Sequence, residues 1–588
     1  MRNLLSLVVL TTLLGFASAE DLPVFSLPWG KYEGEVSAKD EHVIIFRNVR
    51  FGAEPQRFGA PSFPDWTDDS IQNPNKNTTC IQINPAKLEN PPGGRHPIED
   101  PHKVPAAQTE DCLFLDIYVP KWVFAEPEDT TLPVVVWIYG GGYAFGAKDQ
   151  GGPLYTGLPL LRASNYQSIF ITGNYRVGAF GWLAGDYMQK AGQPNAGLYD
   201  QELLFEWVQR YVKLVHGDKE AVSAWGQSAG AGSILHHLIR EGGTKDPLFH
   251  TFAAQSPGFE WAWDNSPGGK LDTIYRNFSR LAGCEFDYNI GCLRKAKVED
   301  LAKANQELFR LVRQTGLFPV GPAVDGKWVQ TLSPIAFSEG KYWKEIFGTI
   351  VSHVANEGEL FTPQDMDSEA KYDQYLNEYF PGPSLAPQRE AIKQQYDCKN
   401  DYDNYRVCVA SIIAHAVFTC NTRDLATAYP DNTYMLAYEF PFVEFSLHGT
   451  DLIPGFMSDA EEAKKLLIEL GLSEFLAEIY ATFLDSLIKS VYQTYFASFG
   501  TYRDPNTLNN QEHWPVVNGK SEEFGSVLRA KLDLLRPSWD FINDKNNSKP
   551  ICTFWSGIAK DIVGSKSTYG DTQSLQLELQ FPLSPNQL

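Results

Sequence analysis

Residues 221–230 read AVSAWGQSAG and combine a short apolar strand with a sharp turn around a serine. The turn has the pattern G-x-S-x-G, and a helical stretch, Ser233–Ile239, follows it. On such a strand–turn–helix the serine hydroxyl is exposed above a sheet, and glycines flank it because larger side chains would collide with the strand and helix. The stretch therefore predicts an α/β protein in which Ser228 is a candidate nucleophile.

Further strands and helices alternate along the chain around this stretch. Residues 132–139 and 168–172 are continuous apolar runs, as expected of strands that are covered on both faces. Asp200–Val215 has apolar residues at helical spacings. Together they predict an α/β fold with a large, mostly parallel central sheet flanked by helices and interrupted by long insertions.

A glycine-rich turn follows one of these expected strands, where residues 139–143 read YGGGY. Glycines allow backbone amides to approach a substrate closely, and the amide of Ala229 at the start of the expected helix points the same way. A serine nucleophile in acyl transfer needs such donors for the oxyanion. The turn is therefore a candidate oxyanion site.

A serine nucleophile also needs a histidine base and an acid that holds the histidine. Seven histidines follow the serine in the chain: His236, His237, His250, His353, His415, His448 and His513. We interpret His236 and His237 as helix packing or surface residues, whereas His448 lies in a polar, glycine-containing loop after an apolar strand. Glu357, after the apolar residues 347–351, is the best candidate acid, and Glu359 is an alternative two residues away.

Length and charge limit the classes of function. The 588 residues carry 50 Lys and Arg against 72 Asp and Glu, a net charge of −22. This sign is opposite to that of a nucleic-acid-binding protein and disfavours an anionic membrane surface. The length alone would suggest about four domains. However, residues from the glycine turn to His448 must meet in one site, so we expect residues 20–588 to form a single domain.

The first residues predict export from the cell. Arg2 is followed by the apolar run Leu4–Phe16 and by the small residues Ala17-Ser18-Ala19. This is the pattern of a secretory signal peptide, and we expect it to span residues 1–19. The apolar run is too short to span a membrane, and no later stretch reaches that length. We therefore expect a secreted protein without a membrane span.

Cysteines and sequons agree with an oxidising compartment. The eight cysteines are Cys80, Cys112, Cys284, Cys292, Cys398, Cys408, Cys420 and Cys552. Their even number suggests four disulfides, but eight cysteines allow 105 pairings. Because no C-x-x-C pattern or histidine cluster occurs in the sequence, we expect no metal site. Asn77, Asn277 and Asn546 begin N-x-S/T sequons and are candidate glycosylation sites.

The chain resembles the type-B carboxylesterase/cholinesterase family of α/β-hydrolases. Besides the serine turn, the motifs that carry the resemblance are EDCLFLDIYVP (110–120), NYRVGAFG (174–181), GLYDQ (197–201) and NEG (356–358). The resemblance implies a catalytic triad of Ser228, Glu357 and His448 and no cofactor. It also implies an oxyanion hole formed by Gly141, Gly142 and Ala229.

The resemblance also implies structural contacts. It pairs the cysteines as Cys80–Cys112, Cys284–Cys292 and Cys420–Cys552, and the remaining Cys398–Cys408 would close a local loop. Arg57 and Glu110 match a structural ion pair of the family. Ser256 falls where relatives have a buried serine near the acid, although Pro257 departs from their pattern.

Three functions remain within this resemblance. A cholinesterase would place a tryptophan between the first two cysteines, and residues 81–111 contain no Trp, Tyr or Phe. A lipase would use the same segment as an apolar lid, for which its prolines and charges are poorly suited. We therefore expect a carboxylesterase that acts on small to medium soluble esters. A lipase of the same family and a non-catalytic adhesion or scaffold protein are the alternatives, and the acyl and alcohol parts and the oligomeric state stay open.

Overall fold

The computed structural model describes residues 22–73, 78–85, 107–149, 155–286, 288–311, 318–440, 445–469, 472–508, 512–533 and 536–564. The expected signal peptide, most of the proline-rich segment between Cys80 and Cys112, and the sequon residue Asn77 lie outside these residues.

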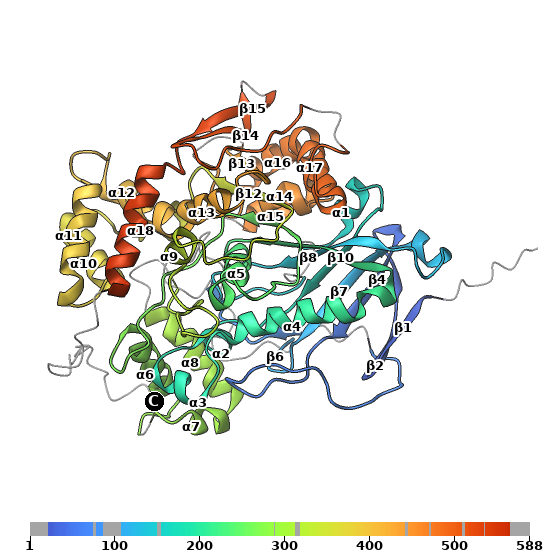
Figure 1. Cartoon of the computed structure of the whole chain (residues 1–588), viewed down its shortest axis with the longest axis horizontal. Coiled ribbons are helices and arrows are strands. Elements are labelled where there is room, and N and C mark those ends of the chain that lie inside the picture. Colours follow the sequence, from blue (N-terminus) through green and yellow to red (C-terminus); the bar gives the residue numbers. More distant parts are fainter. Residues whose placement is uncertain are drawn as a thin grey trace, which may run out of the picture.

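An 11-stranded sheet forms the centre of the described structure (Figure 1). In order across the sheet, the strands are β15 (Arg536–Asp544), β14 (Phe524–Asp533), β13 (Thr433–Tyr438), β12 (Gly348–Val354), β11 (Thr251–Gln255), β10 (Gly217–Gln227), β8 (Leu132–Ile138), β9 (Ile169–Gly173), β7 (Phe114–Pro120), β4 (Asp40–Arg50) and β3 (Glu35–Ser37). The pairs from β9 to β14 are parallel, and the strands beyond them at both edges are antiparallel. Two smaller sheets pair β1 (Val24–Leu27) with β2 (Gly30–Glu33) and β5 (Thr79–Cys80) with β6 (Gln108–Thr109).

Helices cover both faces of the sheet. The α-helices are α1 (Leu158–Ala163), α2 (Ala179–Trp182), α3 (Asp186–Ala191), α4 (Ala196–Tyr211), α5 (Ala229–Leu238), α6 (Lys270–Leu281), α7 (Ile290–Lys295), α8 (Val298–Leu311), α9 (Ser333–Ser338), α10 (Glu369–Tyr379), α11 (Ala386–Gln395), α12 (Tyr405–Ile413), α13 (Cys420–Ala428), α14 (Leu452–Phe456), α15 (Ala460–Glu469), α16 (Glu474–Phe483), α17 (Lys489–Tyr502) and α18 (Lys549–Gly564). Helices α4 and α5 lie on one side of the sheet, and α1, α14 and α17 lie on the other (Figure 1). Within the described ranges, none of the helices is long and apolar enough to cross a membrane.

The central strands are buried because both of their faces are covered. Every residue of β9 and β12 is buried, and so are all residues of β8 except one. Continuous apolar runs are typical of such strands, since neither face needs polar residues. The mostly parallel sheet flanked by helices confirms the predicted α/β class.

The observed element boundaries differ from the expected ones by a few residues. Helix α4 begins at Ala196 instead of residue 200, directly after Asn195, which has the left-handed φ of 58°. It ends at Tyr211, because Val212–Val215 form a 3-10 turn. Helix α5 begins at Ala229 instead of residue 233, since the chain turns from strand into helix within one residue. Apolar periodicity could not reveal this early start, because the first turn of α5 consists of small residues.

Candidate active site

Four candidate segments follow the carboxyl ends of parallel strands. The serine turn follows β10, the glycine turn follows β8, the Glu357 segment follows β12, and the His448 loop follows β13. Because β8, β10, β12 and β13 all run in the same direction, these segments meet at one edge of the sheet. Ligand sites of open α/β sheets lie at this edge.

Ser228 is the single residue between β10 and α5 and has a strained backbone. Its φ of 57° and ψ of −125° are uncommon for a residue with a side chain and cost about 1–3 kcal/mol. Neighbouring backbone hydrogen bonds hold this conformation: Ser228 N donates to Gln255 O (2.9 Å), and Gly258 N and Gly232 N donate to Ser228 O (3.0 and 2.8 Å). The turn therefore holds the serine in one position.

The two glycines of the turn are required by close backbone approaches. A Cβ at Gly230 would lie 2.0 Å from Ile138 O, and a Cβ at Gly226 would lie 2.6 Å from the carbonyl carbon of Gly230. Both distances are far below van der Waals contact. These approaches explain the G-x-S-x-G pattern as packing of α5 against β8 and β10.

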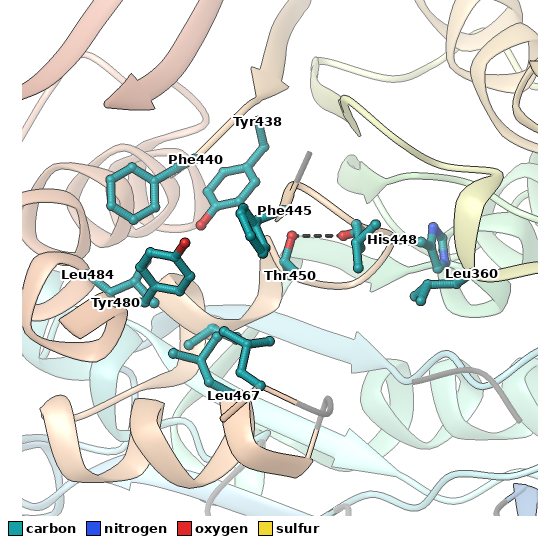
Figure 2. Close-up of a pocket in the computed structure, with 12 residues that line it drawn as sticks. Leu360, Tyr438, Phe440, Phe445, His448, Thr450, Leu467, Tyr480 and Leu484 are labelled. Carbon is teal, nitrogen blue, oxygen red and sulfur yellow. Dashed lines mark hydrogen bonds between the residues drawn. The ribbon is translucent and has the colours of Figure 1, made fainter. Parts of the chain in front are cut away.

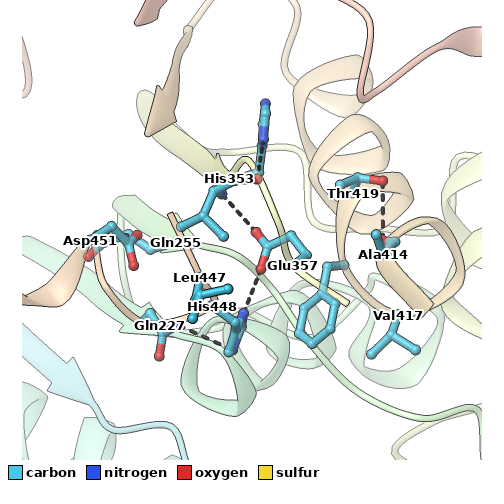
Figure 3. Close-up of polar contacts among 12 residues, drawn as sticks. Gln227, Gln255, His353, Glu357, Ala414, Val417, Thr419, Leu447, His448 and Asp451 are labelled. Atoms are coloured by element: carbon cyan, nitrogen blue, oxygen red, sulfur yellow. Dashed lines mark hydrogen bonds and ion pairs between the residues drawn. The ribbon is translucent and has the colours of Figure 1, made fainter. Parts of the chain in front are cut away.

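His448 and Glu357 form a buried contact (Figure 3). Nδ1 of His448 lies 2.6 Å from Oε2 of Glu357, and the other carboxylate oxygen accepts a hydrogen bond from Val354 N at 2.9 Å. Glu357 is only 1% exposed. A carboxylate fixed in this way orients the imidazole and favours the tautomer with a proton on Nδ1. Glu359, the alternative acid, instead pairs with Arg406.

The opposite edge of the His448 ring points to the serine turn. Its Nε2 lies 3.3 Å from Nε2 of Gln227, the residue before Ser228, and the ring packs against Phe418 and Phe361 at centroid distances of 4.5 and 5.2 Å. Among the described residues, no hydrogen bond joins Ser228 to His448. Catalytic hydrogen bonds are often long without substrate and tighten in the complex.

The glycine turn and the serine line one cavity of about 350 Å³. Gly142 and Ser228 both contribute to its wall. Gly141 and Gly142 have φ values of +103° and +59°, and a Cβ at Gly142 would lie 1.9 Å from the Phe318 ring. Only glycine fits both the backbone and the space here. Ala229, the other candidate amide donor, is fully buried at the start of α5.

A second, larger cavity of about 560 Å³ lies beside His448 (Figure 2). Its wall is mostly apolar and includes Tyr438, Phe440, Phe445, Leu467, Tyr480 and Leu484. Tyr438 ends β13, and Leu467 and Tyr480 lie in α15 and α16. The sequence reasoning missed this cavity, because apolar residues of helices predict packing equally well.

Asp451 is a buried carboxyl group that the sequence reasoning also missed. It is fully buried three residues after His448, and its Oδ2 accepts a hydrogen bond from Gln255 Nε2 at 3.0 Å. Burial, together with the nearby carboxylate of Glu357, raises the pKa of Asp451 from 3.8 to about 7. In the sequence, its position in the same polar loop as His448 was the feature that could have marked it as a site residue.

We expect Asp451→Asn to stabilise the protein in a pH-dependent way. Between pH 3.8 and about 7 the unfolded chain loses this proton while the folded protein keeps it, so the stability of the wild type falls as pH rises. In the asparagine variant residue 451 does not titrate, so this loss of stability with rising pH does not occur. The melting temperature of the variant relative to the wild type should therefore rise between pH 4 and pH 7.5. A difference that stays constant with pH would contradict this.

Three of the other candidate histidines have structural contacts. His236 and His237 are buried in α5, which lowers their pKa values to about 4 and 3. His236 contacts Gly232 O and His237 contacts Gln201, as expected of packing residues. Burial lowers the pKa of His353, but its ion pair with Asp544 outweighs this effect and raises the pKa to about 9.

The eight cysteines form four disulfides, which are the three pairs that the resemblance implied and the remaining pair: Cys80–Cys112, Cys284–Cys292, Cys420–Cys552 and Cys398–Cys408. Arg57 and Glu110 form a two-pronged ion pair with distances of 2.6 and 2.7 Å. Ser256 is buried, and its hydroxyl has no hydrogen-bond partner among the described residues.

The sequon residue Asn546 is exposed, whereas Asn277 is half-buried. In the described ranges, no group of three or more His, Cys, Asp or Glu residues could hold a metal ion.

Comparisons with known proteins give relatives that match most of the chain. The sequence model of a family described as "Carboxylesterase family" matches residues 21–538. The chain is 31% identical over 570 residues to a secreted lipase of Arthroderma benhamiae, covering 95% of this chain and 97% of the lipase. It is also 31% identical over 471 residues to carboxylesterase patB of Penicillium expansum, covering 77% and 76% of the two chains.

Solved structures share the fold. The crystal structure of Aspergillus niger EstA matches with a TM-score of 0.71 and 22% sequence identity, covering 93% of this chain and all of EstA. A thermophilic PNB esterase matches with a TM-score of 0.65 and 21% identity, covering 88% and 97% of the two chains. The sheet and its helices therefore have the α/β-hydrolase architecture of these esterases.

Proposed function

Because the chain belongs to the carboxylesterase family of carboxylic-ester hydrolases, we propose that Ser228, His448 and Glu357 catalyse ester hydrolysis through an acyl-enzyme. The 2.6 Å contact between His448 Nδ1 and Glu357 carries this proposal. Two further observations support it: the strained turn at Ser228 and the position of Gln227 beside the other edge of the imidazole.

In the first step, Ser228 Oγ attacks the ester carbonyl carbon while Nε2 of His448 takes the hydroxyl proton. Glu357 accepts a hydrogen bond from Nδ1 and stabilises the imidazolium. The carbonyl oxygen becomes an oxyanion and accepts hydrogen bonds from the backbone amides of Gly141, Gly142 and Ala229.

The tetrahedral intermediate then collapses, and the bond between the carbonyl carbon and the alcohol oxygen breaks. His448 Nε2–H donates its proton to the leaving alcohol. In the second step, His448 activates a water molecule, which attacks the acyl carbon and releases the acid together with the free Ser228.

The proposed substrates are small to medium soluble esters, and a lipase is the second candidate. The apolar cavity beside His448 and the secreted lipase among the relatives favour the lipase. A series of p-nitrophenyl esters from acetate to palmitate separates the two. A carboxylesterase has its highest kcat/KM on short to medium chains and gains nothing from an emulsion, whereas a lipase gains activity above the solubility limit.

We also propose that residues 20–588 form a single unit that is secreted after cleavage at Ala19. Strands β3, β4 and β7 to β15 share one sheet, and four disulfides favour an oxidising compartment. The intact mass of protein from the culture medium tests the cleavage. One cooperative unfolding transition in calorimetry tests the single unit.

A negative charge at position 227 should raise the lower pH limit of activity. In Gln227→Glu a carboxylate replaces an amide that lies 3.3 Å from His448 Nε2. A negative charge at this distance favours the imidazolium, which cannot act as a base. We expect the acid limb of the kcat/KM profile to move to higher pH by about 1 unit. Gln227→Met is the neutral control, and an equal movement in both variants would contradict the electrostatic cause.

A further inference from the structure

The cavity at Ser228 lies on the acyl side of the candidate site, if the proposed function holds. Gly142, whose amide would bind the carbonyl oxygen, and Ser228, which would carry the acyl group, both line it. His448 must reach the leaving alcohol to protonate it. His448 does not line this cavity and lines the larger one instead. The acyl chain therefore extends into the 350 Å³ cavity.

Glu260 is a charged residue in the otherwise mostly apolar wall of this cavity. Four phenylalanine rings contribute to the same wall: Phe259, Phe318, Phe361 and Phe418. The Glu260 side chain is only 12% exposed. A carboxylate is costly to bury unless its oxygens are bonded. Its presence beside the acyl group therefore calls for a partner.

Lys270 supplies a partner for one carboxylate oxygen only. Its Nζ lies 2.6 Å from Glu260 Oε1, and the lysine side chain is 18% exposed. The ammonium group also lies near the rings of Trp263 and Tyr379, at 5.8 and 5.5 Å from their centroids. Among the described residues, Glu260 Oε2 accepts no hydrogen bond. Oε2 thus has no donor from the described residues, and it belongs to a side chain that lines the cavity.

We propose that Glu260 binds a hydroxyl group on the acyl part of the substrate, so that esters of hydroxy acids are preferred. An ionised acceptor forms a stronger hydrogen bond with a hydroxyl group than a neutral acceptor does. A cationic acyl group fits less well, because Lys270 already neutralises Glu260 and a second ammonium would be repelled and desolvated. The rest of the acyl chain packs against the four aromatic rings.

The expected preference is about tenfold in kcat/KM, which corresponds to one hydrogen bond to a charged acceptor. It is not larger, because Glu260 keeps its ion pair with Lys270 when a plain acyl chain occupies the cavity. The carboxylate is then never left without any partner.

Matched p-nitrophenyl esters test the preference in the wild-type enzyme. The acids are hexanoic, 3-hydroxyhexanoic, 6-hydroxyhexanoic, 6-methoxyhexanoic and 6-aminohexanoic acid, all with the same leaving group. We expect at least one hydroxy ester to exceed both the hexanoate and the methoxy ester, which has the oxygen but no donor. The amino ester should remain below the best hydroxy ester. A hydroxy ester that is no better than either reference overturns the proposal.

Variants assign the preference to Glu260. In Glu260→Leu the ratio of hydroxy ester to hexanoate should fall about tenfold while hexanoate hydrolysis persists. The double variant Glu260→Leu/Lys270→Met avoids a buried lone ammonium and should show the same fall if the single variant misfolds. Lys270→Arg keeps both the carboxylate and its ion pair and should keep the preference. Unchanged ratios in both leucine variants overturn the assignment.

The same assay distinguishes this inference from the proposed function. If the wild type hydrolyses hexanoate without any preference for a hydroxyl group, only the role of Glu260 fails. If the wild type hydrolyses none of the esters and binds no organophosphate, the proposed function fails and the substrate preference with it.

Discussion

Ser228→Ala should reduce kcat for p-nitrophenyl esters by at least about 10⁴-fold. The variant lacks the oxygen that forms the acyl-enzyme, and alanine cannot replace it. Residual activity would come from the oxyanion-hole amides and from substrate binding alone. Initial rates with p-nitrophenyl hexanoate, measured on the purified wild type and variant at equal concentration, check this expectation.

The control is that the variant remains folded. Ser228 is held through its backbone N–H and C=O, and the replacement leaves these hydrogen bonds in place, so the melting temperature should change little. Stoichiometric labelling by an organophosphate should occur in the wild type and not in the variant. Retained hydrolysis in a folded variant would refute Ser228 as the nucleophile. Absence of labelling in folded wild type would favour the non-catalytic alternative.

Glu357→Gln should reduce kcat by about 10³- to 10⁴-fold with a smaller effect on KM. The glutamine can still accept the hydrogen bond from Val354 N, so the local backbone should be preserved. It carries no charge to stabilise the imidazolium of His448, and its amide N–H₂ cannot accept from Nδ1. Steady-state kinetics at pH 7 to 8 measure both constants.

Glu359→Gln is the matched control for this variant. Glu359 lies two residues further along the chain, belongs to the same NEGE segment and pairs with Arg406. We expect its replacement to leave kcat within a few-fold of the wild type. Equal losses in the two variants would indicate a general disturbance of the segment after β12 and would remove the special role of Glu357.

Local sequence was sufficient for the fold class and for the order of the candidate segments. Residues 221–230 predicted a strand, a turn and a helix, and the structure has β10, Ser228 and α5 there. The apolar runs predicted buried parallel strands because a strand with two covered faces needs no alternation. These are short-range patterns, so a single sequence carries them in full.

The spacing of residues in the sequence could not by itself identify the acid that contacts the histidine. Glu357 and Glu359 lie three and five residues after the end of β12, and the structure separates them by their contacts: Glu357 contacts His448, whereas Glu359 contacts Arg406. The resemblance to relatives selected Glu357, and it likewise implied three of the four cysteine pairs, which left Cys398–Cys408 as the fourth. Spacing leaves 105 pairings because a disulfide depends on where distant segments meet.

By itself, the sequence therefore determined the α/β architecture, the serine turn and the candidate residues, because each depends on neighbours within a few positions. Only the tertiary structure decided which residues line the same cavity. It placed Glu260, which pairs with Lys270, in the wall of the cavity that Ser228 lines, buried Asp451 against Gln255, and separated a cavity at the serine from one at the histidine. These contacts join segments up to about 200 residues apart in sequence, and such distances are set by packing of the whole sheet and its helices.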